Sequence, residues 1–397
     1  MQGSSTITNC KAGKGGGVHV SGGTFKMQDS AIVTPSTGSE QYTAGKNDVY
    51  LESGKTITVD GTLSNNPAAR ITPQSYTENT PVLKGNITGS SPQNYTKFTV
   101  TPQDVVDGKM FWYITDAGLL KAEVEDASLL QEVISGRPNN TPFIIKLGNI
   151  DDLQTVQIPN GKKITLKADN ASKPAILKCP SKSDGYKHLQ VQRDATLILE
   201  GLITLQGTDY GSNSQYALYV EYEGKAEIKN GVTITGFKNA DRGAVIADGT
   251  LTMSGGEISG NKAKRGGGVF VGATGNFIMK GGTITKNKAK NGGGVYVNGS
   301  HNGGYPIRGQ FTMLGGTIDG NTADKGGGVY IAPNRNFTMT GGTITKNTAN
   351  RGKGMMVRGS SATFDWKNGE ITANEGTGNA VVTEGGGNFN AHGHTAS

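Results

Sequence analysis

The chain has 397 residues with a formal net charge of +7, and 62 of its residues are glycine. The glycines do not fall at every third position, which excludes a collagen triple helix. Hydrophobic residues make up 34% of the chain and recur at fixed spacings, which argues against disorder, and no run of 18 apolar residues predicts a transmembrane segment.

The first residues of the chain match a repeat that is clearest near its end. The segment GKGGGVHV at 13–20 matches KNGGGVYV at 290–297, so the chain starts inside a repeat unit. We therefore expect residues 1–125 to be the C-terminal part of a first β-helix with its closing region. We also expect more of this solenoid, and an export signal, upstream.

Residues 126–137 are predicted to form the one helix of the chain. An apolar stripe consists of Leu129, Leu130, Val133 and Ile134. Ser128 and Gln131 resemble a capping box, and Gly136 ends the helical pattern. A strand is predicted next, at 143–147. A short amphipathic helix in this place would cover the open end of a second β-helix, which we assign to residues 126–397.

Five isoleucines mark a repeat in the last third of the chain, at intervals of 26, 34, 26 and 27 residues. Apolar residues recur seven and five positions before each isoleucine, an asparagine three positions after it, and a hydrophobic residue eleven positions after it. A shared register of this kind indicates a repeat architecture. The isoleucines are Ile258, Ile284, Ile318, Ile344 and Ile371, and the residues placed at eleven are Val269, Val295, Val329, Met355 and Val382.

Within each repeat the apolar residues come in pairs two positions apart, such as Phe337 and Met339, which is the period of a strand with one buried face. Three short apolar patches per repeat, separated by Gly, Asn and Lys turns, predict a coil with three faces. The sequence therefore predicts an all-β fold, a right-handed parallel β-helix that forms a three-faced solenoid with coils of about 26 residues. The regular coils occupy residues 251–382.

The recurrent asparagines are predicted to form a structural ladder, in which each side-chain amide bonds to its copies above and below. A catalytic role is the less favoured alternative for them. These residues are Asn261, Asn287, Asn321, Asn347 and Asn374.

The unit in which I-x-x-N is followed by GGGV resembles the repeats of bacterial surface β-helix proteins, notably the polymorphic outer-membrane protein family. In that family F-x-x-N precedes GGAI. The resemblance covers residues 251–382 and part of 1–20. It implies export to the bacterial cell surface or the extracellular space, and a role as an adhesin or antigen.

Parallel β-helices also include pectate-lyase-like polysaccharide lyases and glycoside hydrolases, which need converging carboxylates or an aspartate cluster for Ca²⁺. In the regular coils no position carries Asp or Glu in more than two of the five copies, and the five histidines show no metal-binding spacing. We therefore predict no catalytic residue, no metal and no cofactor. An enzyme is the less favoured alternative, and its site would lie within residues 150–250.

The two cysteines, Cys10 and Cys179, lie far apart in the sequence and fit no metal or redox spacing. Buried apolar thiols are the favoured interpretation, and a disulfide between them is the alternative.

Three features suggest ligand binding instead. Phe270, Tyr296 and Tyr330 alternate with inward valines, so they are predicted to point outward as an aromatic ladder for sugars or proteins. The favoured alternative is that they only shield the sheet by stacking on each other. Lysines near the asparagine turn form a stripe that could meet an anionic glycan, and a solvated turn is the favoured alternative. The candidate residues of the stripe are Lys262 and Lys288, and those of an inserted loop at 299–308 are His301, Tyr305 and Arg308.

These observations predict a non-enzymatic, extracellular or cell-surface adhesin or structural stalk. Its expected partner is a host or extracellular-matrix protein or glycan, including an anionic one, and no nucleic acid.

Overall fold

The computed structural model describes residues 1–37, 40, 42–105, 108–168, 174–180, 187–208, 215–239, 241–299, 309–372, 374–375 and 379–396. Within these ranges the chain is mostly β-strand with a single α-helix. It divides into two compact units. The first is Met1–Glu123 with Phe143–Lys146, and the second is Val124–Pro142 with Leu147–Ser397.

The first unit contains short parallel sheets that enclose one hydrophobic core, in which Val49, Ile57 and Ile71 are fully buried. One sheet has the order β2 (Val18–Val20), β5 (Val49–Leu51), β7 (Ala69–Pro73), β9 (Phe98–Val100), and another has β3 (Phe25–Asp29), β6 (Ile57–Leu63), β8 (Leu83–Gly85). Parallel pairing also joins β1 (Thr6–Ile7) to β4 (Ile32–Val33). The remaining elements are the 3-10 helix η2 (Asn94–Lys97) and the strands β10 (Gln103–Val105), β11 (Gly108–Met110), β12 (Tyr113–Ile114), β13 (Leu120–Lys121), β14 (Glu123–Val124) and β15 (Pro142–Leu147).

Helix α1 spans Ala127–Ser135, within the predicted range, but its N-terminal cap differs from the prediction. The Asp126 carboxylate accepts the hydrogen bond from the Leu129 amide at 2.7 Å, so Asp126 and not Ser128 is the cap. The Gln131 side chain instead bonds the backbone N–H and C=O of Gln157 in β16 (Val156–Ile158). Because β16 is the first strand of its sheet, this helix satisfies backbone groups at a sheet edge.

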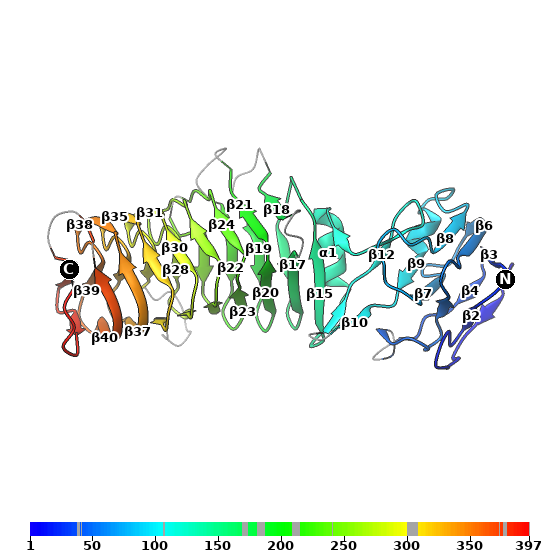
Figure 1. Cartoon of the computed structure of the whole chain (residues 1–397), viewed down its shortest axis with the longest axis horizontal. Coiled ribbons are helices and arrows are strands. Elements are labelled where there is room, and N and C mark those ends of the chain that lie inside the picture. Colours follow the sequence, from blue (N-terminus) through cyan, green and yellow to red (C-terminus); the bar gives the residue numbers. More distant parts are fainter. Residues whose placement is uncertain are drawn as a thin grey trace. The chain divides into compact units, whose positions relative to one another are not determined.

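The second unit consists of four series of parallel strands, which lie side by side along its length (Figure 1). The first series continues from β16 through β19 (Lys187–Val191), β22 (Tyr216–Val220), β25 (Val245–Ala247), β28 (Val269–Val271), β32 (Val295–Val297), β36 (Val329–Ile331), β39 (Met355–Arg358) and β41 (Val381–Glu384). A second series comprises β17 (Lys163–Ala168), β20 (Thr196–Gly201), β23 (Lys225–Ile228), β26 (Thr250–Met253), β29 (Asn276–Met279), β33 (Gln310–Met313), β37 (Asn336–Thr345), β40 (Thr363–Thr372) and β42 (Asn388–Asn390).

A third series comprises β18 (Ala175–Lys178), β21 (Ile203–Gln206), β24 (Thr233–Thr235), β27 (Glu257–Ser259), β30 (Thr283–Thr285) and β34 (Thr317–Asp319), and it joins β37 and β40. The fourth is a short sheet of β31 (Lys288–Asn291), β35 (Thr322–Lys325) and β38 (Thr348–Arg351). We call one repeat of this pairing, from one isoleucine of the register to the next, a level.

The strand register pairs equivalent residues of successive repeats. Ile258 pairs with Ile284, which pairs with Ile318. In the same way Phe311 pairs with Phe337, and their rings stack with centroids 4.4 Å apart. The prediction was wrong for the last level, because Val382 pairs with Met356. The residue that pairs with Met355 is Val381, which comes ten residues after Ile371. This level is one residue shorter between its isoleucine and the next strand.

Candidate functional site

The recurrent asparagines form a continuous hydrogen-bonded column inside the second unit. In the last four of these asparagines, Oδ1 accepts bonds from both the backbone N–H and the Nδ2 of the asparagine one level before it, at 3.0 to 3.1 Å. In the first, Asn261, Oδ1 accepts from the Phe237 backbone N–H. Each Nδ2 also donates to an isoleucine carbonyl, as Asn321 does to Ile284 at 2.8 Å. All five side chains are buried, so their polar groups are satisfied within the stack.

The aromatic residues expected to point outward are not exposed. Phe270, Tyr296 and Tyr330 retain only 1%, 8% and 3% of their accessible surface, so their prediction as an exposed ladder was wrong. They stack on each other, with ring centroids 5.6 and 5.1 Å apart. Their strands, β28, β32 and β36, are buried on both faces. The favoured alternative, that these rings shield the sheet, agrees with this packing.

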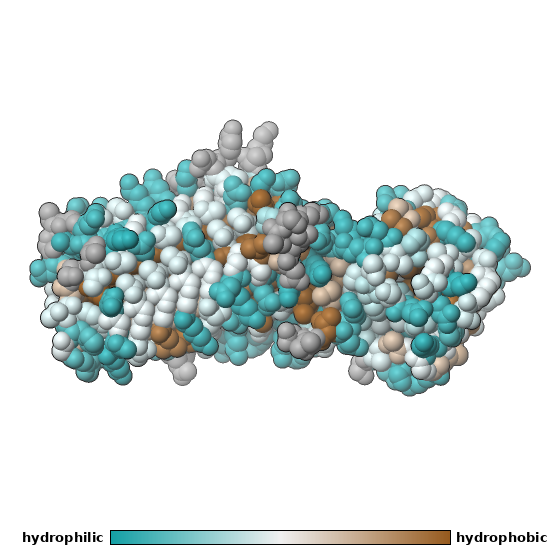
Figure 2. Space-filling model, viewed as in Figure 1, coloured by the Kyte–Doolittle hydropathy of each residue, from teal (hydrophilic) through white to brown (hydrophobic). Residues whose placement is uncertain are grey.

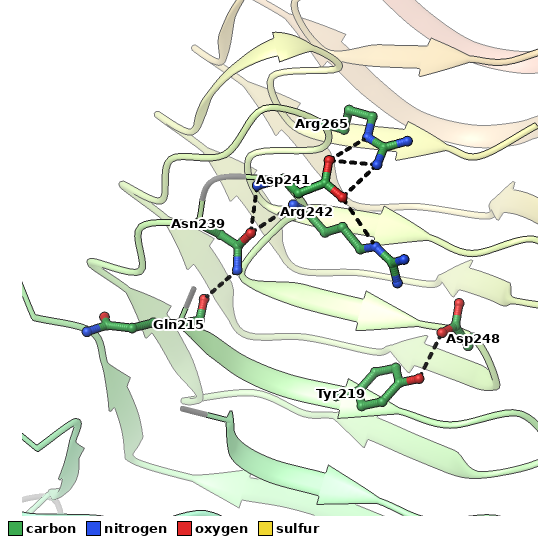
Figure 3. A network of polar contacts seen from close by, with 7 residues as sticks. All are labelled: Gln215, Tyr219, Asn239, Asp241, Arg242, Asp248 and Arg265. Carbon is green, nitrogen blue, oxygen red and sulfur yellow. Dashed lines mark hydrogen bonds and ion pairs between the residues drawn. The ribbon is translucent and has the colours of Figure 1, made fainter. Parts of the chain in front are cut away.

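Arginines cover this aromatic stack from outside. The Arg265 guanidinium lies 5.3 Å from the Phe270 ring centroid and 5.8 Å from that of Tyr296, within cation–π range. Asp241 holds Arg265 through both carboxylate oxygens, at 2.6 and 2.7 Å (Figure 3). Asn239 in turn accepts bonds from the Asp241 and Arg242 amides, which fixes the turn that carries the carboxylate. These arginines are therefore engaged within the protein.

A second polar cluster lies where β22 and β25 end. The Tyr219 hydroxyl donates to Asp248 Oδ2 at 3.1 Å (Figure 3), and burial raises the pKa of the Asp248 carboxyl. The carboxylate lies against Gly272, where a Cβ would come within 1.6 Å of Asp248 Oδ1. Glu221 directly follows the strand residue that pairs with Ala247, so it lies at the same level of the neighbouring strand as Asp248.

This cluster was not singled out from the sequence, because Asp248 and Glu221 lie before the regular coils in which acidic positions were compared. A signal is present all the same, since each acid comes at the same place, directly after a buried strand. A buried carboxyl group with a raised pKa and a tyrosine hydroxyl bonded to it is a feature that occurs often at functional sites. The cluster is therefore the best candidate for chemistry within residues 150–250.

The structure places the predicted lysines on the surface. Lys262 and Lys288 are exposed and lie beside each other, joined by an isolated parallel β-bridge. In Figure 2 the visible face of the second unit is mostly hydrophilic or neutral, with small hydrophobic areas. The predicted loop residues His301, Tyr305 and Arg308 lie outside the described residues.

Neither cysteine forms a disulfide. Cys179 is buried as expected, whereas Cys10 is only half-buried. Cys179 Sγ lies 2.8 Å from His188 Nε2, and burial raises the pKa of this thiol to about 12 and lowers that of the imidazole to about 3. Both groups are therefore neutral around pH 7. Among the described residues no group of three or more His, Cys, Asp or Glu side chains is arranged to hold a metal ion.

Comparison with known proteins gives one match. The family model described as "Right handed beta helix region" matches residues 200–390. No curated protein and no solved structure matches the chain significantly. In the part of the chain that is described, no helix is long and apolar enough to cross a membrane. The family match and the long parallel sheets together support a β-helix repeat protein.

Proposed function

We propose that residues 126–397 form a right-handed, three-faced parallel β-helix with coils of about 26 residues, and that the chain is a non-enzymatic adhesin or stalk. In this proposal the protein is exported to the bacterial cell surface or the extracellular space. There it binds a host or extracellular-matrix protein or glycan. The resemblance of its repeats to the polymorphic outer-membrane protein family supports the proposed location.

The observation that carries the proposal is that the interior residues repeat from level to level, whereas the surface residues change. The asparagine column joins five successive levels, and the paired phenylalanines stack along the same direction. Surface positions differ from level to level, as Lys290, Asp324 and Asn350 do at one register position. A stack of this kind is a stiff support whose outer residues can change without altering the fold, which suits display of a binding surface.

The proposal is tested at the cell surface and in solution. Antibodies against the chain should label intact, unpermeabilised cells of the organism that produces it. The purified chain should bind at least one member of a panel of matrix proteins and glycans. Labelling that requires permeabilised cells, together with no binding in the panel, would show that the protein is neither an adhesin nor a surface stalk.

A carbohydrate-active enzyme is the second candidate, and the Tyr219–Asp248 pair is the observation that favours it. If the cluster is catalytic, the chain should release unsaturated or reducing ends from an acidic or neutral polysaccharide. Asp248→Asn should then abolish this release, because the amide cannot donate a carboxyl proton. The matched control is Asp194→Asn, which changes an exposed aspartate paired with Arg193. Binding without release of ends would favour the adhesin.

A further inference from the structure

Five lysines of the second unit lie in two adjacent columns on its outer surface. Lys238 pairs with Lys262, which pairs with Lys288, so these three occupy the same place in successive levels. Lys264 and Lys290 come two residues further along. They face each other, because they lie between the Lys262–Lys288 pairing and the Arg265–Asn291 pairing. We call these five residues the lysine patch.

The backbone fixes the spacing of the patch. Neighbouring parallel strands lie about 4.8 Å apart, and residues two positions apart along a strand lie about 6.6 Å apart on the same side. The residues between the columns, Ala263 and Ala289, are buried, so the lysines on both sides of them point outward. All five lysines are exposed. The patch is therefore a small regular grid of positive charge.

Four lysines of the patch have no ionic partner among the described residues. Within the described residues Lys262, Lys264, Lys288 and Lys290 form no ion pair, and their ammonium groups form no hydrogen bond. Two carboxylates lie near the patch: Asp324 stands opposite Lys290 on the neighbouring strand but forms no ion pair with it within the described residues, and Asp241 binds Arg265 and Arg242. Four ammonium groups on neighbouring strands repel one another, and an anionic ligand would relieve that repulsion.

The fold does not need lysine at these positions. In the next levels Thr322 and Thr348 occupy the register position of Lys288. Asp324 and Asn350 likewise occupy that of Lys290, beside the same buried alanines, Ala323 and Ala349. The strands pair in the same way with or without the lysines. Their confinement to three successive levels therefore indicates a bounded binding surface and not a requirement of the turn.

We propose that the lysine patch binds a linear acidic polysaccharide, with sulfate or carboxylate groups of successive sugars placed against successive rows of lysines. This inference rests on the proposed function and names its ligand. Lysine is suited to such a polymer because its ammonium group is a compact charge that accepts anions from many directions. A chain lying along the stack would meet one row of lysines per level.

The same surroundings disfavour a single-stranded nucleic acid. Proteins that bind such strands combine positive charge with exposed aromatic rings on which the bases stack. The aromatic residues nearest in the repeat, Phe270 and Tyr296, are buried. The nearby forks of Arg242 and Arg265 are paired with Asp241. The patch offers charge without a stacking surface, which fits a polysaccharide.

The test replaces the lysines with the residues that the neighbouring levels already use. A patch variant carries Lys262→Thr, Lys288→Thr, Lys264→Asn and Lys290→Asn, which copy Thr348 and Asn350. A control carries Lys163→Thr and Lys225→Thr, which copy their strand partners Thr196 and Thr250 at another exposed place in the same unit. An arginine variant carries Lys→Arg at the four patch positions. Circular dichroism on each variant checks that the fold is kept.

Heparin serves as the probe, and its affinity for the full chain is measured over a range of salt concentrations. The patch variant should bind roughly tenfold to a hundredfold more weakly than the wild type, with a shallower salt dependence, because fewer counterions are released. The Lys163/Lys225 control should keep wild-type affinity. A Lys262→Thr/Lys288→Thr variant removes the same number of charges as this control, and it should bind heparin more weakly than the control does. The arginine variant should also keep wild-type affinity.

Three results would overturn the inference. These are equal losses in the patch and control variants, no heparin affinity in the wild type, or tighter binding of DNA than heparin through the same lysines at equal salt. The proposed function is tested independently of this inference. A chain that does not bind heparin can still bind a matrix protein, and antibodies against it can still label intact cells.

Discussion

Asn321 shows how much a single side chain contributes to this fold. Its Oδ1 accepts from the backbone and side chain of Asn287, and its Nδ2 donates to the Ile284 carbonyl and to Asn347. One amide thus satisfies buried groups on both sides of its own level. Only an amide of this length can both donate and accept at the same place, which explains why asparagine recurs there.

Asn321→Ala should lower the free energy of unfolding by about 3 kcal/mol or more, because it leaves several buried polar groups unpaired at once. Urea unfolding followed by circular dichroism measures the change. Asn390→Ala, which alters an exposed asparagine of β42, is the control and should be nearly neutral. A loss for Asn321→Ala no greater than that of the control would mean that the ladder adds nothing to stability.

His188 makes stability depend on pH in a predictable direction. Burial lowers the pKa of its imidazole from the ordinary 6.5 to about 3. Below pH 6.5 the His188 imidazole therefore binds a proton in the unfolded chain but stays neutral in the folded protein. Stability falls as the pH decreases through this window, and the loss is complete only near the folded pKa.

His188→Gln should remove that part of the pH dependence. Between pH 6 and pH 5 the free energy of unfolding of the wild type should fall by about 1 kcal/mol more than that of the variant. Denaturant unfolding at the two pH values gives both slopes. Asn390→Ala, which changes an exposed residue that does not titrate, should keep the wild-type slope. An unchanged slope in His188→Gln would show that the buried imidazole is protonated in the folded state.

At the scale of elements, the sequence predicted what depends on local pattern and failed where tertiary packing decides. The two-residue period located the strands of the regular region, and the pairing of Ile284 with Ile318 follows directly from the repeat. The same period wrongly predicted that Tyr296 is exposed. A two-residue period predicts which face of the strand a side chain lies on. It does not predict whether other side chains cover the outer face. Here neighbouring rings and the Arg265 guanidinium cover it.

The candidate site was predictable only in part, for a similar reason. The exposed position of Lys262 and Lys288 follows from their place beside a buried alanine. The Tyr219–Asp248 pair, in contrast, joins residues 29 positions apart, and the raised pKa of Asp248 comes from burial. Neither the contact nor the burial is encoded in a local motif. Helix α1 was located by its apolar stripe, yet its cap residue depended on backbone geometry that composition does not specify.

The turn before each of several strands of the first series depends on a glycine in a left-handed conformation. Gly292 has a φ of +65°, and a Cβ there would lie 2.2 Å from the Val295 carbonyl oxygen. Gly292→Ala should therefore cost about 1–3 kcal/mol of unfolding free energy, measured by urea denaturation. Gly22→Ala is the control, because Gly22 has ordinary φ and open space around its Cα. Equal effects of the two substitutions would contradict the strained turn.

At the scale of the whole molecule, the repeat alone indicated that residues 1–20 and 251–382 share a register. The first compact unit of the structure runs from Met1 to Glu123 and also includes Phe143–Lys146. These four residues are separated in sequence from the rest of the first unit, and a segment this short carries no periodic signal of its own. Long-range assignment of this kind follows from packing and not from pattern.

The stack also predicts how damage spreads. Each level buries its inner surface against its two neighbours, so a local defect should loosen adjacent levels and leave distant ones intact. In Gly292→Ala, hydrogen exchange measured by mass spectrometry should therefore become about tenfold faster or more in β32 and β36, since each 1.4 kcal/mol corresponds to a factor of ten. Exchange in β5 and β7 of the first unit should not change. Faster exchange in all four strands together would mean that the chain opens as a single cooperative body, and the nearest-neighbour description would then be wrong.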